Sequence, residues 1–166
     1  MGYKIYNFAP VKGILFSLFA LIISLFASLT SIAQTSTDKS DQLFQAVRKS
    51  QVPLVKAFLD QNADPNYIKA TGPWMKTNLL ITAVNKENLE VVKLLVLHKA
   101  DINWKDGFNT SALMYAGTKG NKEIFLYLLE NGADIHATDG HGNTVLSAAR
   151  EGGNKELIAL VEEKLK

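Results

Sequence analysis

Apolar and polar positions repeat at long intervals over most of this chain. Alanines recur 37, 33 and 33 residues apart, each with a leucine three residues before it: Ala46, Ala83, Ala116 and Ala149. Five residues before each alanine stands a residue type that favours a helix N-cap, because its short side chain accepts a free amide of the first turn. These N-cap candidates are Asp41, Asn78, Ser111 and Thr144. The pattern predicts four helices that begin in register.

A second apolar pattern follows each of these helices. Apolar residues at i, i+1, i+3 and i+4 form one broad stripe on a helix, and the four stripes begin at Leu54, Val91, Ile124 and Leu157. Asn62, Lys99 and Gly132 then precede an Ala-Asp dipeptide, at the place where a helix commonly ends in a left-handed residue. Each unit is therefore expected to be helix, turn, helix, and a spacing of 33 residues is typical of a repeat protein.

The third and fourth units contain motifs that are more specific. The third unit begins Asp106-Gly-Phe-Asn-Thr-Ser-Ala-Leu-Met and closes with Gly132-Ala-Asp-Ile-His, and the fourth begins Asp139-Gly-His-Gly-Asn-Thr. Over residues 41–166 the pattern closely resembles the ankyrin repeat. The resemblance implies an all-α solenoid of four helix-turn-helix units with short hairpin-like connecting turns. The expected units are about 41–66, 67–103, 104–136 and 137–166.

The chain departs from the family pattern in three ways. The family's Thr-Pro-Leu-His reads Asn-Leu-Leu-Ile from Asn78, so the N-cap and leucine remain while the usual histidine-centred hydrogen bonds cannot form. Pro53 stands in the first unit where later units have a glutamate. Four extra residues lie within Tyr67–Lys76, so the first connecting turn should be enlarged.

The N-terminal 33 residues differ in composition from the rest. Residues 1–12 carry two lysines and no acid, residues 14–29 are apolar apart from three serines, and Ser31 and Ala33 are small. These are the three parts of a secretory signal peptide, with cleavage expected after Ala33. The alternative is an uncleaved membrane anchor, although the apolar segment is shorter than the roughly 20 residues that span a bilayer. Residues 34–40 are expected to form a flexible linker.

Charge and cysteine content limit the function classes. Two of the 18 Lys and Arg lie in the leader, so the other 16 balance 16 Asp and Glu. A nucleic-acid-binding domain usually carries a marked basic excess, so no nucleic-acid partner is expected. The chain has no cysteine, which excludes disulfides, thiolate metal sites and a thiol nucleophile. A signal peptide on such a domain predicts a periplasmic or secreted bacterial protein.

The resemblance also implies where a partner would bind. Ankyrin-repeat proteins mostly bind other proteins through the turns between units (the fingers) and the exposed surface of the inner helices (the palm). By position, the finger candidates are Trp74, Met75, Phe108 and His141, and the palm candidates are Asn85, Lys86, Thr118, Lys119 and Glu151. Aromatic and Met side chains are enriched in protein interfaces. The alternatives are that Trp74 and Phe108 fold back and pack on neighbouring turns, and that the lysines form a solvated face.

No metal, cofactor or catalytic site is expected. His136 and His141 lie near Asp134 and Asp139, and these residue types bind metals, but the repeat itself requires both acids in its turns. His98 ends an outer helix and is interpreted as a solvated cap residue. The Ser and Thr residues of the motifs are explained as caps or turn residues, and no catalytic triad or phosphate-binding loop emerges.

Together these observations predict a monomeric, non-catalytic protein that is exported and binds an unidentified partner protein. Two alternatives stay open: a dedicated inhibitor or protector of an exported enzyme or toxin, and a membrane-tethered scaffold with an uncleaved leader. Membrane association is expected only for the scaffold.

The two readings of the leader predict different mature proteins. Removal of residues 1–33 would give an exported protein that begins at Gln34. N-terminal sequencing of the protein recovered from a bacterial host measures this directly. A start at Met1 or Gly2 would support the anchored scaffold instead.

Overall fold

The computed structural model describes residues 39–166, which form one compact unit. The predicted signal peptide and residues 34–38 lie outside the described residues. Lys39 and Ser40, assigned to the linker from the sequence, are helical. Ser40 is buried, and the Lys39 ammonium donates to the Gln61 carbonyl oxygen at 3.3 Å. These contacts explain why the first helix includes two residues that composition alone placed in a linker.

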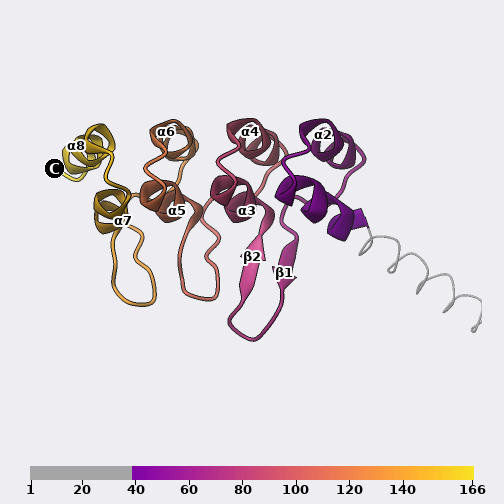
Figure 1. Ribbon diagram of the computed structural model, residues 1–166, viewed down its shortest axis with the longest axis horizontal. Coiled ribbons are helices and arrows are strands. Elements are labelled where there is room, and N and C mark those ends of the chain that lie inside the picture. Colours follow the sequence, from indigo (N-terminus) through magenta and orange to yellow (C-terminus); the bar gives the residue numbers. More distant parts are fainter. Residues whose placement is uncertain (1–38) are drawn as a thin grey trace, which may run out of the picture. The chain divides into compact units, whose positions relative to one another are not determined.

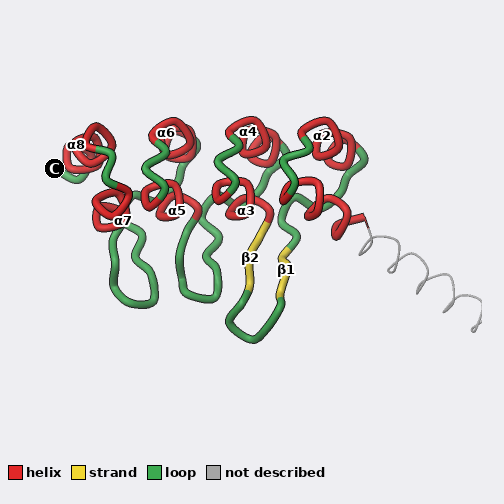
Figure 2. Tube along the Cα trace, viewed as in Figure 1, coloured by secondary structure: helices red, strands yellow, loops and turns green. Residues whose placement is uncertain are grey.

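Helices follow one another in pairs, as Figures 1 and 2 show. The pairs are residues 39–48 with α2 (Val52–Asp60), α3 (Leu79–Asn85) with α4 (Leu89–Leu97), α5 (Ala112–Thr118) with α6 (Lys122–Glu130), and α7 (Val145–Gly152) with α8 (Lys155–Lys164). The first helix, α3, α5 and α7 form an inner row from which the fingers project, and α2, α4, α6 and α8 form an outer row. The predicted helical solenoid is therefore present.

One finger contains regular β-structure. Strands β1 (Ile68–Ala70) and β2 (Lys76–Asn78) pair antiparallel, with Lys69 opposite Thr77. This hairpin is the predicted enlarged turn, and Figure 1 shows it extending beyond the two later fingers. In those fingers the pairing shrinks to single bridges, because they lack the four extra residues. Within residues 39–166, no helix has both the length and the apolar content that crossing a membrane requires.

Inner helices begin where the sequence predicted, with one exception. Asn78, Ser111 and Thr144 each accept the backbone amide three residues ahead, as N-caps do. The Thr144 amide also donates to the Ser147 hydroxyl, which completes a capping box. The prediction for Asp41 was wrong, because the first helix already begins before it. Its carboxylate faces the hairpin instead.

The outer helices have N-caps that the sequence analysis missed. Asn88, Asn121 and Asn154 immediately precede α4, α6 and α8, and their side chains accept amides of the first turn at 3.0–3.1 Å. The signal was present as an asparagine recurring at one position of three units. In the first pair Gln51 makes no such bond, and Pro53 lies in the first turn of α2. Its ring pre-sets a helical φ and removes one amide that would need a cap.

The predicted left-handed helix ends are confirmed. The φ angle is +59° at Asn62, +71° at Lys99 and +94° at Gly132. An L-residue with a Cβ is strained in this conformation, whereas glycine is not. Lys99 is therefore the least suited of the three residues to its position.

Hydrogen bonds from two asparagines join successive turns. Asn66 donates to the Lys99 carbonyl oxygen at 3.2 Å and accepts the Asp101 amide at 2.7 Å. Asn103 bridges to the Gly132 carbonyl and the Asp134 amide in the same way. Each asparagine thus satisfies a donor and an acceptor of the next turn, which sets the spacing between adjacent helix pairs.

The core lies between the two helix rows and continues through all the pairs. Leucines of the inner helices are almost fully buried at Leu43, Leu80 and Leu113, while Leu146 of the last pair is half-buried. Inner helices approach closely where residues are small: a Cβ on Gly152 would lie 2.1 Å from the Gly117 carbonyl oxygen. The close contact of α5 and α7 therefore requires glycine at position 152.

Replacing Lys99 by glycine tests the strain at this helix end. We expect Lys99→Gly to raise the free energy of unfolding by about 1 kcal/mol, because glycine adopts the left-handed conformation without a Cβ clash. Urea unfolding measures the change. Lys86→Gly is the matched control: φ is −86° at Lys86, so there glycine should destabilise by about 0.5–1 kcal/mol. If Lys99→Gly had a lower free energy of unfolding than the parent protein, the prediction of strain at Lys99 would be contradicted.

Candidate functional site

The fingertips expose apolar side chains. The exposed fraction is 72% for Trp74, 63% for Met75 and 53% for Phe108, and His141 at the equivalent place in the last finger is also exposed. These side chains have not folded back into the neighbouring turns. Trp74 and Phe108 each leave more than half of their surface exposed, so packing against neighbouring turns covers only the smaller part of either side chain.

Finger backbones, in contrast, pack tightly against one another. A Cβ on Gly107 would lie 1.8 Å from the Trp74 carbonyl oxygen, and the Gly140 amide donates to the Phe108 carbonyl oxygen at 2.8 Å. Neighbouring tips are thus in direct main-chain contact. The exposed side chains are held at fixed spacing by a rigid backbone.

Aspartates hold the two later fingers from within. One carboxylate oxygen of Asp106 accepts the amides of Phe108 and Thr110 at 2.8 and 2.9 Å, and the other accepts the Tyr115 hydroxyl at 2.7 Å. Asp139 accepts the equivalent two amides in the next finger. Burial is the larger cause of a raised pKa of the Tyr115 hydroxyl, and the hydrogen bond to Asp106 raises this pKa further. Tyr115 is therefore a neutral donor that ties this finger to α5.

A groove lies between the hairpin and the inner helices of the first three pairs. Its volume is about 470 Å³, and it is open to solvent. Six of its lining residues define its chemistry: Phe44, Arg48, Lys69, Met75, Lys76 and Phe108. Asn85, Asp106 and Tyr115 also line it. The groove therefore combines residues from three helix pairs, and no single unit could form it.

The Asp41 carboxylate fixes the base of the hairpin. It accepts hydrogen bonds from the Tyr67 hydroxyl and from the Lys69 ammonium, the latter at 2.8 Å. The Tyr67 ring packs edge-on against Phe44, with centroids 6.5 Å apart. Two hydrogen bonds hold the pKa of Asp41 below its usual value: the one from Lys69 has the larger effect and the one from Tyr67 the smaller. This cluster positions the groove wall formed by the hairpin against the wall formed by the first helix.

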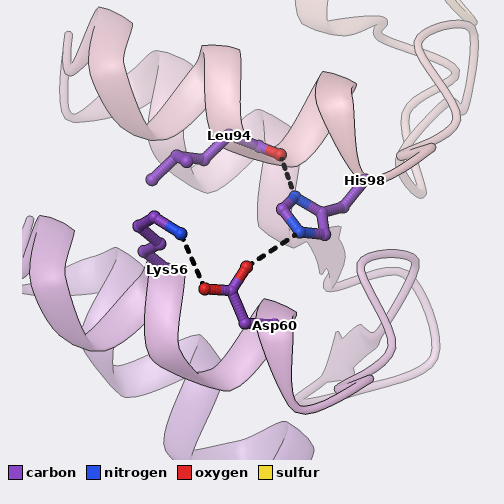
Figure 3. A network of polar contacts seen from close by, with 4 residues as sticks. All are labelled: Lys56, Asp60, Leu94 and His98. Carbon is purple, nitrogen blue, oxygen red and sulfur yellow. Dashed lines mark hydrogen bonds and ion pairs between the residues drawn. The ribbon is translucent and has the colours of Figure 1, made fainter.

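His98 has a larger structural role than the sequence suggested. It is the C-cap residue of α4, as predicted, but its side chain is only 25% exposed. Its Nδ1 donates to the Leu94 carbonyl oxygen at 2.9 Å, and its Nε2 lies 3.5 Å from Asp60 of α2 (Figure 3). Asp60 also accepts from Lys56 at 2.6 Å. His98 thus links neighbouring outer helices, and the contact is an ion pair when the imidazole is protonated.

The acids beside the other two histidines are turn residues. Asp134 accepts the His136 amide and Asp139 accepts the His141 amide, both at 2.8 Å. The two acids are engaged by the turn geometry, as the repeat pattern predicted. In the described part of the chain, no three His, Asp or Glu residues are grouped so that they could hold a metal ion.

The comparison with known families agrees with this geometry. A family model described as ankyrin repeats in three copies matches residues 43–139. The chain belongs to the ankyrin-repeat family. The matched residues run from the first helix to Asp139 in the last finger, and α7 and α8 follow the match. No curated protein matches the chain at a significant level.

The ankyrin stack brings together only some of the predicted site residues. Met75, Asn85 and Phe108 line the groove, whereas Thr118 and Glu151 line a second hollow of about 120 Å³ between α5 and the last finger. The remaining predicted residues lie outside both linings: Trp74, Lys86, Lys119 and His141.

Several groove residues were missed by sequence reasoning. Phe44 and Arg48 come from the first helix, and Lys76 and Tyr115 come from β2 and α5. The first pair departs most from the family pattern, so position in the repeat did not mark its residues. The available signal was the Arg-Lys pair at 48–49, which occupies the palm position of the first inner helix.

The Asp41 cluster makes stability depend on pH. Because folding lowers the pKa of Asp41, its contribution is present above the unfolded-state pKa of about 4 and is lost as pH falls through the lower folded value. We expect Asp41→Asn to unfold at a lower temperature than the parent at about pH 6, with the difference shrinking towards pH 2. Thermal unfolding, monitored by circular dichroism, measures the unfolding temperatures of the two proteins at each pH. Glu163→Gln is the control, since the exposed Glu163 side chain has no hydrogen bond or ion pair within residues 39–166. If the parent, Asp41→Asn and Glu163→Gln all had the same unfolding temperature at each pH, this role of Asp41 would be contradicted.

Proposed function

We propose that this protein is an exported, monomeric adaptor of four ankyrin units that holds a partner protein in the groove and on the fingertips. Ankyrin repeats generally mediate protein–protein interactions and typically act without catalysis of their own. The partner contacts in this proposal are Trp74, Met75 and Phe108 on the fingers and Asn85 on the palm. Export to the periplasm or the medium is supported by the basic, apolar and small-residue segments of residues 1–33.

The observation that carries the proposal is the combination of exposed apolar side chains with a rigid backbone. Trp74 and Phe108 expose 72% and 53% of their surface, yet the main chains that carry them are in contact. Exposed apolar surface of this kind marks interaction sites in soluble proteins. A pre-organised backbone also lowers the entropy lost on binding.

Four units are supported by the helix pairs of residues 39–166 and by their shared features. N-caps recur on the last three inner helices and the last three outer helices. The last pair exposes Glu162 and Glu163 on α8, as expected for a terminal unit that faces water on one side.

Loss of the exposed aromatic side chains should weaken partner capture. We expect the Trp74→Ala/Phe108→Ala variant to retain about tenfold less of the partner protein, or even less, than the parent retains. The reason is that aromatic side chains that become buried on binding dominate interface energies. The bait is protein purified after expression of the full chain, and the measurement is quantitative pull-down from a periplasmic extract.

The control removes equally exposed apolar groups from the outer helices. Leu54 and Leu97 expose 47% and 71% of their surface on α2 and α4, so Leu54→Ala/Leu97→Ala should leave capture unchanged. Both variants should keep the parent circular dichroism spectrum. Equal capture by the finger variant and the parent would overturn the proposed surface.

A further inference from the structure

The groove contains positive charge that the protein does not neutralise. Of its three cations, only Lys69 is paired, by Asp41 at 2.8 Å. The Arg48 guanidinium donates to the neutral Gln45 amide at 3.1 Å. The Lys76 side chain forms no ion pair with any residue of 39–166. Arg48 of the first helix and Lys76 of β2 thus line the groove without an ion-pair partner in the described part of the chain.

The one acid that lines the groove, Asp106, forms no ion pair with Arg48 or Lys76. Asp106 is 9% exposed. One of its oxygens accepts two turn amides, and the other accepts the Tyr115 hydroxyl. Its oxygens therefore hold the finger that precedes α5, and its single negative charge leaves the three cations of the lining in excess.

Positive charge continues along one side of the palm. Lys49, Lys86 and Lys119 occupy equivalent positions at the ends of three inner helices and are all exposed. A helix C-terminus favours a cation, and this accounts for Lys86 and Lys119 as stabilising residues. It does not account for Lys76, which lies on β2. In the last inner helix Gly152 occupies the equivalent position. The exposed Glu151 beside it has no ion pair within residues 39–166, whereas Arg150 is paired with Glu162.

Apolar side chains lie beside these cations. Met75 and Phe108 form the rim of the groove and are more than half exposed, while Phe44 and Ile81 form buried parts of its lining. A small-molecule site normally encloses most of its ligand, which such exposed walls do not do. An extended chain segment can lie across the inner helices and place one side chain on the rim and another between the cations.

We propose that the groove binds an extended acidic segment of a partner protein. An Asp or Glu of that segment pairs with Arg48 and Lys76, and an adjacent large apolar side chain packs between Met75 and Phe108. The acidic part lies over the first two helix pairs, because Glu151 repels it from the last. This inference rests on the proposed function and adds the chemistry and the orientation of the partner.

Peptide selection tests the chemistry without knowledge of the natural partner. A random library of 12-residue peptides is selected on the protein purified after expression of the full chain, and the best binder is labelled for fluorescence anisotropy. We expect enriched peptides to carry Asp or Glu beside an aromatic or aliphatic residue. Their affinity should fall as salt rises, because exposed charge pairs are screened.

Charge reversal then locates the contact. Arg48→Glu/Lys76→Glu should weaken the selected peptide about tenfold or more, and a peptide with Lys in place of its acids should bind this variant better than it binds the parent. Binding of the lysine-containing peptide to this variant also shows that the variant is folded. The matched control is Lys155→Glu/Lys166→Glu, at the α8 end of the stack, which should change affinity less than about twofold.

Other outcomes separate this inference from the proposed function. Enriched peptides without acidic residues that lose binding in Trp74→Ala/Phe108→Ala would overturn the charge inference and leave the binding surface standing. Peptides whose affinity is unchanged by Arg48→Glu/Lys76→Glu and by Trp74→Ala/Phe108→Ala would overturn both the inference and the proposed function. Absence of any enriched peptide, or tighter binding to phosphatidylglycerol vesicles than to the peptides, would overturn the acidic segment as ligand.

Discussion

Close packing of neighbouring inner helices is the constraint on which the rest of this structure depends. A single helix pair cannot bury its apolar face, so each pair must stack on the next. Ala116 and Ala149 are fully buried, and Gly152 approaches the Gly117 carbonyl so closely that a side chain would not fit. Because the inner row packs through small residues, the fingers that extend from it come into main-chain contact. The proposed binding surface is thus a consequence of how the core is packed.

The fingers satisfy their own polar groups, and this leaves their side chains free. Asp106 and Asp139 accept the amides that a tight turn would otherwise leave unpaired. Turn stability therefore does not depend on whether position 108 is aromatic or polar. Substitution of the exposed tip side chains should therefore leave these turn hydrogen bonds intact. This division between structural carboxylates and variable tips explains why Phe108 and His141 can occupy equivalent places.

The two ends of the stack differ in charge although the domain as a whole is neutral. Cations gather on the first helix and the hairpin, where Arg48 and Lys76 face the groove, and the palm ends at Glu151. Asp41 neutralises Lys69 and ties the hairpin to the first helix at the same time. The neutral composition argued against a nucleic-acid partner, but it concealed this local separation of charge. Local separation of this kind selects the orientation of a charged partner.

The sequence by itself determined the repeat, three of the four inner N-caps and the left-handed helix ends, because these features depend on residues within a few positions of each other. It also determined the enlarged first finger, which follows from a spacing of 37 residues. It could not place Asp41 correctly, since the partners of this carboxylate, Tyr67 and Lys69, are 26 and 28 residues away. Nor could it show the groove, whose walls come from three helix pairs. Only the stacking of those pairs decided which exposed residues share one surface, because contacts between units depend on tertiary packing and not on position within a repeat.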